Sequence, residues 1–435
     1  MYKISKYTFF TEDNKENILL YNAYCGRNSL CKVQDKNIVK CLLENKINGL
    51  DSSIMTELIN RGIIVDYYED ENKKLYSQFL DVVVPRKLSL IINPTEQCNF
   101  RCKYCYESFN NGEMSKEVQE KVISYVRNNI HKYSGLNVSW FGGEPLLAME
   151  GVAYLSEQFI KICSFYKVPY RANITTNGYC LDIDTFRKLI DLHVNYFQIT
   201  IDGIATIHDK QRTTISGKGS YNRIINNLRA VKESQIRNFN IVLRTNFTNE
   251  IFDSIEEYLK IISSFCENDS RFSVSWYKVG NWSKFIPQEI NLMFVTDASA
   301  GMRKIYNAIL KYEKAIPIKM DYLDPGSGLC YGGKKNNFVI SSNGTVHKCT
   351  INFEDTSSIV GELYDNRIEY NKNYYCHIAN PHRCKQYHDC FFAPVCTGDP
   401  CPIKQDEERK CSFVKDNLDL ILQIIDRFEP FKVIA

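Results

Sequence analysis

The sequence predicts an α/β protein with a central parallel sheet covered by helices, flanked by a small α+β unit and a cysteine-rich region. Strand and helix patterns alternate through the middle of the 435-residue chain, as in chains that build parallel sheets. The first residues combine short strands and helices without that alternation. Eleven of the 17 cysteines form two groups, one after the first central strand and one near the C-terminus.

The composition excludes several classes of protein. The chain is 44% hydrophobic and 24% charged, a globular balance. A net charge of +3 argues against a nucleic-acid binder. No apolar stretch is long enough to span a membrane, and no secretory core opens the sequence. We therefore expect a cytoplasmic protein that binds neither nucleic acid nor membrane. In a reducing cytosol, clustered cysteines indicate metal ligands or catalysts rather than disulfides.

Residues 1–85 form the predicted N-terminal unit. Ile18–Val33 is rich in β-branched and aromatic residues and predicts strands joined by a turn, while Asn37–Leu43 and Ile54–Ile59 have helical spacing. Strands, two helices and a wing-like end predict a winged-helix-like module. The alternative is an N-terminal extension packed on the main domain. The charged run Glu69–Lys74 predicts a solvated linker.

Residues 86–280 carry the strand–helix repeats. The predicted strands are Leu88–Ile92, Leu136–Trp140, Tyr170–Thr175, Tyr196–Ile201, Ile241–Thr245 and Phe272–Tyr277. The predicted helices between them are Lys116–Tyr133, Val152–Tyr166, Ile183–Leu192, Ser220–Ser234 and Ser254–Phe265. This pattern fits either an open α/β sheet or a curved, partial barrel. In both folds the chemistry lies at the carboxyl ends of the strands.

Two further segments complete the predicted organisation. Residues 281–329 predict a helical connector centred on Ala298–Lys314. Residues 330–435 are rich in cysteines and turns and close with a helix, Val414–Phe428.

The first cysteine group lies in the loop after the first central strand. Cys98, Cys102 and Cys105 are separated by three and then two residues. Three thiolates so spaced can face one point, as ligation of an iron–sulfur cubane requires, and they leave one iron open. A zinc site would need a fourth ligand nearby, and the sequence offers no obvious one. The remaining alternative is a redox pair of cysteines with one structural cysteine.

The order of motifs resembles the radical S-adenosylmethionine (SAM) enzymes. In that family a Cys-x3-Cys-x2-Cys motif, with an aromatic residue such as Tyr104 before its last cysteine, ends the first strand of a (βα)6 repeat. Segments similar to the family's follow the next three predicted strands, at Trp140–Pro145, Thr175–Gly178 and Thr200–Gly203. His208–Arg212 then follows as in the branch of the family that modifies peptides.

The resemblance implies a partial (β/α)6 TIM-like barrel that binds SAM through a [4Fe–4S] cluster on Cys98, Cys102 and Cys105. It implies that Glu144 receives the methionine ammonium group and that Thr200 and Arg212 hold the carboxylate, a group that arginine can bind in bidentate fashion. The full set of implied SAM contacts is Tyr104, Gly142, Gly143, Glu144, Pro145, Asn177, Thr200, Asp202 and Arg212. No catalytic base is assigned.

The second cysteine group resembles the SPASM domain, a C-terminal iron–sulfur extension of peptide-modifying radical enzymes. Its members are Cys330, Cys349, Cys376, Cys384, Cys390, Cys396, Cys401 and Cys411. Eight thiolates suffice for two further [4Fe–4S] clusters. A hairpin around Asn343–Gly344 would hold the opening Cys-x13-Gly-x4-Cys segment. Two treble-clef zinc sites are the alternative.

The resemblance divides these ligands between two auxiliary clusters. Cys330, Cys349 and Cys401 would share the first. Cys376 has no clear counterpart in the family and is the candidate that would complete it. The second would take Cys384, Cys390, Cys396 and Cys411. One departure from the family pattern is that Tyr387 stands where the family has a cysteine, and Cys384 lies three residues earlier.

The resemblance implies a radical SAM oxidoreductase-type enzyme that generates a 5′-deoxyadenosyl radical. We expect a maturase that installs a thioether or carbon–carbon side-chain cross-link in a ribosomally made (RiPP) precursor peptide. Its partners would be the precursor with its leader sequence and an electron donor such as a flavodoxin or ferredoxin. One alternative is an anaerobic sulfatase-maturing, formylglycine-generating enzyme, although Thr350 replaces the acidic residue expected there. Another is a non-radical iron–sulfur or zinc regulatory protein.

Overall fold

The computed structural model describes residues 1–435 except 281–296, 352, 354, 399–400, 402–410 and 435. The chain divides into two compact units. Unit 1 comprises residues 1–84, 302–334 and 378–435, and unit 2 comprises residues 85–301 and 335–377. The predicted connector therefore lies partly outside the described residues, and the predicted domain at 330–435 contributes to both units.

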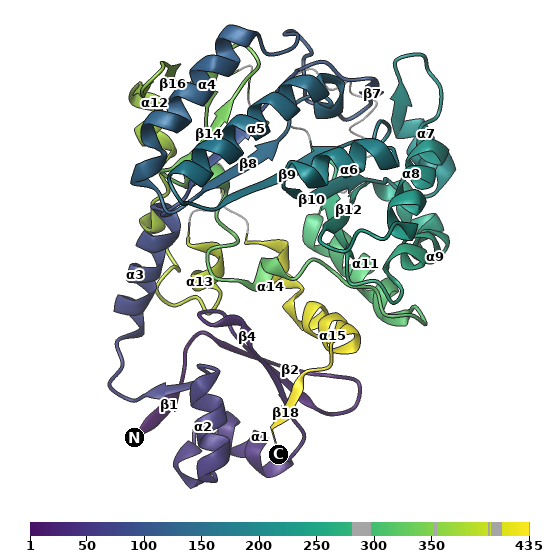
Figure 1. Ribbon diagram of the computed structural model, residues 1–435. Coiled ribbons are helices and arrows are strands. Elements are labelled where there is room, and N and C mark those ends of the chain that lie inside the picture. Colours follow the sequence, from purple (N-terminus) through teal and green to yellow (C-terminus); the bar gives the residue numbers. More distant parts are fainter. Residues whose placement is uncertain (281–296, 352, 354, 399–400, 402–410, 435) are drawn as a thin grey trace. The chain divides into compact units, whose positions relative to one another are not determined.

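Unit 2 is built on one large mixed sheet with an α/β architecture (Figure 1). Its strand order is β13-β12-β10-β9-β8-β6-β14-β15-β16-β17. The parallel strands are β6 (Leu88–Ile92), β8 (Leu136–Trp140), β9 (Tyr170–Thr176), β10 (Val194–Thr200), β12 (Asn240–Phe247) and β13 (Phe272–Lys278). The six predicted strands are confirmed to within two residues at each end, because their β-branched residues alternate with turns and helices at regular intervals.

Helices connect these strands, and α4, α5 and α6 lie over one face of the sheet (Figure 1). The helices of unit 2 are α4 (Lys116–Asn129), α5 (Met149–Phe165), α6 (Ile183–Asp191), α7 (Ala205–Gln211), α8 (Tyr221–Glu233), α9 (Ile255–Cys266) and α12 (Lys372–His377). The predicted helix Lys116–Tyr133 ends at Asn129 and continues as a short 3-10 turn. Burial of apolar side chains from both the strands and the helices forms the core of this unit.

The predicted hairpin around Asn343–Gly344 is present and also extends the large sheet. β14 (Asn337–Ile340) and β15 (Thr345–His347) pair antiparallel, and Gly344 has a φ of +88° in the turn. β14 lies parallel to β6 on its other side. β16 (Ile359–Leu363) and β17 (Ile368–Tyr370) continue the sheet in antiparallel fashion. The sequence did not predict that the hairpin would join the central sheet.

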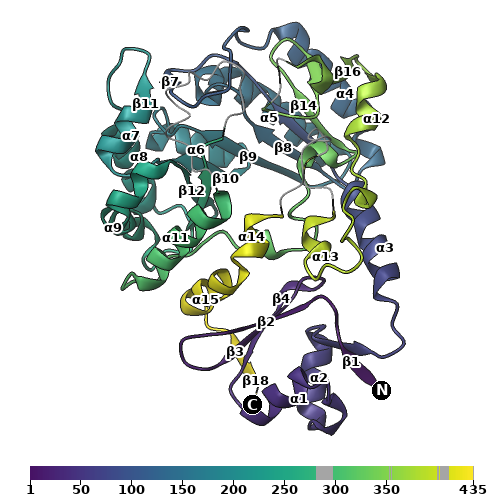
Figure 2. The ribbon, with the colours of Figure 1, turned by 180° about the vertical axis from the view of Figure 1, so that it is seen from behind.

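Unit 1 contains the small N-terminal sheet. Its strands are β2 (Thr8–Glu12), β3 (Ile18–Asn22), β4 (Gly26–Val33) and β18 (Lys432–Ile434), in the order β18-β4-β3-β2. A second pair joins β1 (Tyr2–Ile4) to β5 (Ile64–Asp66). Helices α1 (Lys36–Leu43) and α2 (Ser52–Asn60) confirm the two predicted helical segments. Figure 2 shows the yellow C-terminal strand β18 among the purple N-terminal strands.

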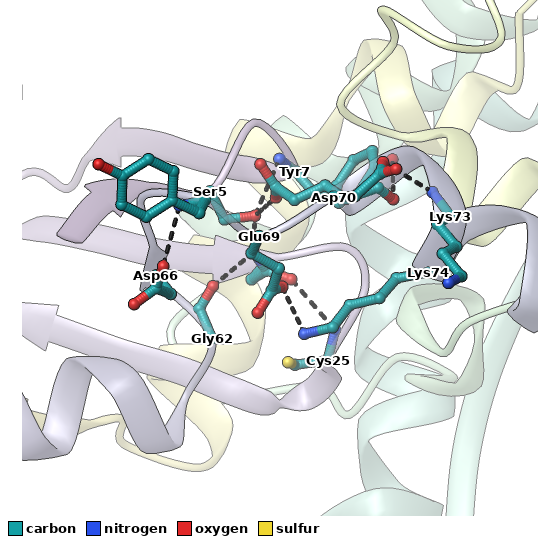
Figure 3. A network of polar contacts seen from close by, with 12 residues as sticks. Ser5, Tyr7, Cys25, Gly62, Asp66, Glu69, Asp70, Lys73 and Lys74 are labelled. Carbon is teal, nitrogen blue, oxygen red and sulfur yellow. Dashed lines mark hydrogen bonds and ion pairs between the residues drawn. The ribbon is translucent and has the colours of Figure 1, made fainter. Parts of the chain in front are cut away.

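The charged run Glu69–Lys74 is not a linker, which corrects the prediction. It begins helix α3 (Glu71–Val83), whose first turn is capped by the Asp70 carboxylate. Asp70 Oδ1 accepts from the backbone N–H of Lys73 at 3.1 Å, and Lys74 pairs with Glu69 (Figure 3). Glu71 is buried and accepts from Ser5 Oγ at 2.6 Å. The prediction failed because two of the charged residues have structural roles: Asp70 caps helix α3 and Glu71 is buried.

The remaining part of unit 1 comes from the end of the chain. The described helices are α13 (Ala393–Cys396), α14 (Phe413–Asp416) and α15 (Leu418–Phe428), and α11 (Ala298–Lys311) precedes them in the sequence. The predicted closing helix is thus present but interrupted at Asn417. Among the residues that the structure describes, no helix has the length and hydropathy needed to cross a bilayer.

Candidate active site

The three cysteines of the first group line one cavity in unit 2. The loop after β6 carries Cys98, and the short strand β7 (Phe100–Cys102) leads to Cys105. The cavity has a volume of about 140 Å³. Its other polar lining residues include Tyr104, Glu107, Thr175, Thr176, Asn177, Thr200 and Arg212. The sequence argument that strand-end motifs meet at one edge of the sheet is therefore confirmed for most of these residues.

The three cysteines are half-buried, and their thiols lie close enough to act on one another. Burial raises the pKa of Cys98 to about 12, and the nearby Cys102 thiol adds to that rise. Burial also raises the pKa of Cys105 to about 12, with contributions from Cys102 and Cys98. Thiolates this close repel one another unless a bound cation compensates them. An iron–sulfur cluster provides that compensation.

No described group of three or more His, Cys, Asp or Glu side chains has the arrangement of a single-metal site. A [4Fe–4S] cluster binds each thiolate through a different iron, so its thiolates face a common centre but lie farther apart than the ligands of a single ion. Three half-buried thiols around one cavity therefore fit a cluster better than a zinc ion, which holds its ligands at the short distances of a single centre.

Gly142 and Gly143 allow the loop after β8 to pack on the loop that carries Cys98. A side chain on Gly142, whose φ is +110°, would lie 2.4 Å from the carbonyl oxygen of Thr95. A Cβ on Gly143 would lie 2.3 Å from the carbonyl oxygen of Gln97. The backbone N–H of Glu144 donates to that same Gln97 oxygen at 2.9 Å. The backbone contact between the two loops therefore requires glycine at both positions, whether or not a ligand is bound.

The Glu144 side chain joins the ends of β8 and β9. It is fully buried and accepts from Thr176 Oγ1 at 2.6 Å, from Asn177 N at 2.7 Å and from Leu146 N at 3.1 Å. Burial raises the pKa of Glu144, while these hydrogen bonds oppose the rise. Neither Glu144 nor Pro145, which begins a 3-10 turn, lines the cavity. Their contact with SAM stays a prediction, but the structure gives Glu144 a positioning role.

Arg212 lies at the other side of the cavity in a buried polar network. Its Nη1 donates to the Tyr104 hydroxyl at 2.6 Å and lies 3.6 Å from Asp202 Oδ2. Tyr104 donates to Asp202, and Asn246 Nδ2 donates to Tyr104 at 3.2 Å. Burial opposes the charge of Arg212, but Cys102, Tyr104 and Asp202 hold its pKa well above the usual value. Arg212 is therefore a buried cation.

The guanidinium keeps one donor for a ligand. Arg212 Nε is buried and has no hydrogen-bond partner among the described residues. A buried donor without a partner is costly, so a bound acceptor at this point would relieve it. A carboxylate is the best-matched acceptor for a guanidinium. The arrangement thus fits the carboxylate of a bound methionine moiety.

His208 positions Arg212 through its backbone. Its Nδ1 accepts from the backbone N–H of Asp202 at 3.2 Å, and its Nε2 lies 3.0 Å from Ser220 Oγ. Ser220 Oγ in turn donates to the Arg212 carbonyl oxygen at 2.7 Å. Burial, with a further effect of the Arg212 charge, holds the pKa of His208 well below its usual value. The ring is therefore neutral.

Sequence reasoning missed several residues of this site. Tyr106 and Glu107 directly follow Cys105 and line the cavity. Burial and the nearby Glu96 raise the pKa of Glu107 to about 8. Asn246 joins the Tyr104 network from β12. Tyr106 and Glu107 could have been identified because they directly follow Cys105, whereas nothing in the sequence indicates that Asn246 belongs to the site.

The second cysteine group is divided between the two units. Cys349 and Cys376 belong to unit 2, whereas the other six belong to unit 1. The first auxiliary set, with members in both units, stays a prediction. In unit 1, burial raises the pKa of Cys396 to about 11, with added effects of the Cys390, Cys384 and Cys411 thiols. The other three cysteines predicted for the second auxiliary cluster thus lie near enough to Cys396 to raise its pKa.

Tyr387, which stands in place of a family cysteine, is a packing residue. Its ring lies edge-on to Phe79 at 6.4 Å between centroids, and it is 2% exposed. Gly398 lies against the same ring, since a Cβ there would come within 2.7 Å of it. Cys384 is close enough to Cys396 to influence its pKa, which is consistent with its substitution for the missing ligand.

Comparison with known proteins adds the family. A profile of the radical SAM superfamily matches residues 92–262, the segment that contains the cysteine loop and most of the parallel strands. This part of the chain belongs to the radical SAM superfamily. Membership of this segment implies SAM and a [4Fe–4S] cluster as its cofactors.

Two curated relatives illustrate the range of the superfamily. The chain is 26% identical over 200 residues to Fe-coproporphyrin III synthase of Methanosarcina barkeri, covering 44% of this chain and 46% of that protein. It is 28% identical over 187 residues to a cysteine-type anaerobic sulfatase-maturating enzyme of Clostridium novyi, covering 40% and 48%. The chain spans about half the length of the first curated relatives that it matches.

One solved structure supports the fold. The structure of native anSMEcpe with bound AdoMet and a Kp18Cys peptide matches with a TM-score of 0.58 at 18% identity, covering 78% of this chain and 98% of that one. A weaker likeness, with a TM-score of 0.46 at 13% identity, is to Streptococcus suis SuiB bound to S-adenosylmethionine, covering 91% and 90%.

The Glu144 contacts predict a stability effect. Glu144→Gln places an NH2 group against N–H and O–H donors, so we expect a loss of about 2 kcal/mol in the free energy of unfolding. Urea unfolding of the purified chain measures it. Glu150→Gln, an exposed position in the next helix, is the control. Equal losses in both variants would contradict the positioning role of Glu144.

The neutral His208 predicts a dependence of stability on pH. Because its folded pKa lies below its unfolded value of about 6.5, the unfolded state binds the proton first and stability falls as pH decreases. Between pH 7 and pH 5.5 this group alone should cost about 1.2 kcal/mol. We expect His208→Gln to lose less stability than the wild type over that interval. Urea unfolding at the two pH values tests this, with exposed His131→Gln as control. An unchanged pH dependence in His208→Gln would show that the ring is not held neutral.

Proposed function

We propose that this chain is a radical SAM peptide maturase that installs a thioether or carbon–carbon side-chain cross-link in a ribosomally made precursor peptide. One observation supports radical chemistry: Cys98, Cys102, Cys105 and the buried, charged Arg212 line the same cavity. It supplies thiolates for a cluster and a guanidinium for an amino-acid carboxylate within one small space.

The chain's own residues would divide the work as follows. The three cysteines would hold the [4Fe–4S] cluster and leave one iron for the amino and carboxylate groups of SAM. Arg212, kept charged by Tyr104 and Asp202, would fix the carboxylate through Nε. When bound, the cluster and SAM supply a 5′-deoxyadenosyl radical that removes hydrogen from an unactivated carbon. Phe100, Phe109 and Phe141 line the cavity and would exclude water.

Two features support a peptide as the substrate. The N-terminal residues form a small sheet with two helices, which fits a winged-helix-like element that pairs an extended peptide with a sheet edge. The thiols of Cys384, Cys390, Cys396 and Cys411 gather in unit 1, which supports an auxiliary cluster. Such a cluster would accept the electron from a substrate radical or bind a substrate thiol. An electron donor such as a flavodoxin or ferredoxin would reduce the SAM cluster.

The second candidate is an anaerobic sulfatase-maturing, formylglycine-generating enzyme, favoured by the similarity to the Clostridium novyi protein. Such enzymes are expected to carry an acidic residue directly after the cysteine that corresponds to Cys349. Here that residue is Thr350, which is buried and hydrogen-bonded to Tyr106. The absence of an acid at this position favours the cross-linking maturase.

Metal content and cofactor cleavage test the proposal. After anaerobic reconstitution we expect about twelve irons per chain, from three cubane clusters, and formation of 5′-deoxyadenosine on reduction with SAM. Replacing Cys98, Cys102 and Cys105 together by Ala should leave about eight irons and abolish 5′-deoxyadenosine, since only the first cluster would be lost.

Cys163→Ala provides the matched control, because Cys163 is a buried cysteine of helix α5. It should retain both the iron and the cleavage. Survival of SAM cleavage in the triple variant, or zinc in place of iron in the wild type, would contradict the proposed function.

A further inference from the structure

The outer edge of strand β4 is only partly covered in unit 1. β4 spans eight residues, Gly26–Val33, and pairs with β3 along one edge. On its other edge the three-residue strand β18 pairs in parallel with Cys31, Lys32 and Val33. The first five residues of β4 thus have no strand beside them on that edge among the described residues.

β18 is held mainly by two side chains on the same face. Ile434 is 3% exposed and packs in the apolar core of the small sheet with residues such as Leu20 and Val33. Lys432 Nζ pairs with Glu57 Oε1 of helix α2 at 2.9 Å. Val433, which alternates with them, is 38% exposed. The anchor therefore has a simple pattern: a basic residue, any residue, then an aliphatic residue.

Other groups, rather than a strand, lie along this half of β4. At its start Arg27 pairs with Asp324 at 2.7 Å, and a Cβ on Gly26 would lie 2.7 Å from Pro325. Arg61 Nη1 donates to the carbonyl oxygens of Leu30 at 2.8 Å and Asn28 at 3.3 Å. Its Nε donates to Glu57 Oε1 at 2.8 Å, the same carboxylate oxygen that Lys432 contacts. Glu57 thus contacts both Arg61, which lies along one half of the β4 edge, and Lys432 of β18, which covers the other half.

The open half also borders space for more chain. A cavity of about 760 Å³ is lined by Arg27, Asn28 and Leu30 of β4 and by Pro430 and Phe431, which lead into β18, among other residues. A strand that continued β18 toward lower residue numbers would run along Gly26–Leu30. Pro430 lacks an N–H and does not continue the ladder. Strand β18 therefore pairs with three of the eight residues of β4 on this edge.

The opposite edge of the sheet is faced by other side chains. The Phe9 ring of β2 stacks on Phe391 at 5.3 Å between centroids. Gln423 Nε2 donates to the carbonyl oxygen of Glu12, the last residue of β2, at 3.4 Å. The β4 edge is the one on which this chain itself seats a parallel strand.

We propose that β18 is a displaceable stand-in for an extended peptide, and that the precursor peptide binds β4 by taking its place. This rests on the proposed function, since it takes the precursor as substrate. The incoming segment would place an aliphatic residue where Ile434 lies and a basic residue opposite Glu57. Main-chain hydrogen bonds to β4 would supply affinity, and the two alternate side chains would supply specificity.

Replacement of β18 by the precursor peptide is favourable because the peptide can pair with more residues of β4 than β18 does. In the free enzyme, β18 protects the edge from pairing with another chain. As a tethered competitor at high effective concentration, β18 also lowers the apparent affinity for any guest. Weakening β18 should therefore tighten binding of a peptide to this edge.

The test uses a fluorescein-labelled synthetic peptide with the sequence of residues 429–435 as the probe and the full-length chain as the receptor. Ile434→Asn puts a polar amide in the apolar core and should release β18, so we expect the probe to bind this variant about tenfold more tightly than the wild type. Val433→Asn, the same change on the exposed face, should bind like the wild type. A probe with Asn in place of its isoleucine should not bind.

Fluorescence anisotropy gives the affinities, and circular dichroism checks the fold. Equal probe affinity of Ile434→Asn and wild type, with the fold intact, would overturn the proposal. If Ile434→Asn does not fold, Lys432→Glu, which repels Glu57 without entering the core, should still give about a threefold gain. No gain in a folded Lys432→Glu chain would overturn the proposal in the same way.

A longer probe tests the open half of the edge. A peptide that replaces the residues before the lysine by five β-branched residues would pair with Gly26–Leu30, and it should bind more tightly than the first probe. Iron content and SAM cleavage do not enter these measurements. A failure of strand exchange is thus distinguishable from a failure of the proposed radical chemistry.

Discussion

The buried carboxylate of Glu144 is the constraint on which the site depends. Parallel strands end at one edge of a sheet, but the loops that follow them are not positioned by the sheet itself. Glu144 bonds to the start of its own turn and to the end of β9. Gly142 and Gly143 let the same turn pack on the backbone before Cys98. Three strand ends are thereby fixed to one another, and the cavity lies among them.

The site also requires a cation that stays charged although it is shielded from water. The Cys102 thiol, the Tyr104 hydroxyl and the Asp202 carboxylate surround Arg212 and offset the cost of its burial. His208 remains neutral and acts on the backbone of Arg212 through Ser220. A protonated ring at that position would place a second cation beside Arg212. The neutral histidine thus preserves an electrostatic balance that suits one anionic ligand group.

Much of this arrangement could be predicted from the sequence. The strands that carry the site have β-branched runs bounded by turn residues, and short cysteine spacing restricts where Cys98, Cys102 and Cys105 can point. The six parallel strands and the hairpin at Gly344 were predicted for those reasons. The resemblance to the radical SAM enzymes also pointed to Asn177, Thr200 and Arg212, which line the same cavity as the three cysteines.

The parts that the sequence did not reveal depend on contacts between distant residues. The charge of Glu69–Lys74 predicts a linker, yet this run begins helix α3 and its Glu71 is buried against Ser5. The pairing of β7 with β11 (Arg212–Thr214) brings Cys102 beside Arg212, and no local pattern indicates it. β18 is too short to be recognised as a strand, because three residues have meaning only when their partner on β4 is known.

The account's central claim is that one cavity holds both the cluster and SAM. Electron paramagnetic resonance of the reduced, reconstituted chain, recorded with and without SAM, tests it most directly. We predict that SAM changes the spectrum of the wild-type cluster, and that Arg212→Met weakens this change while retaining the iron. A cluster spectrum that SAM leaves unaltered in the wild type would contradict the assignment of this cavity.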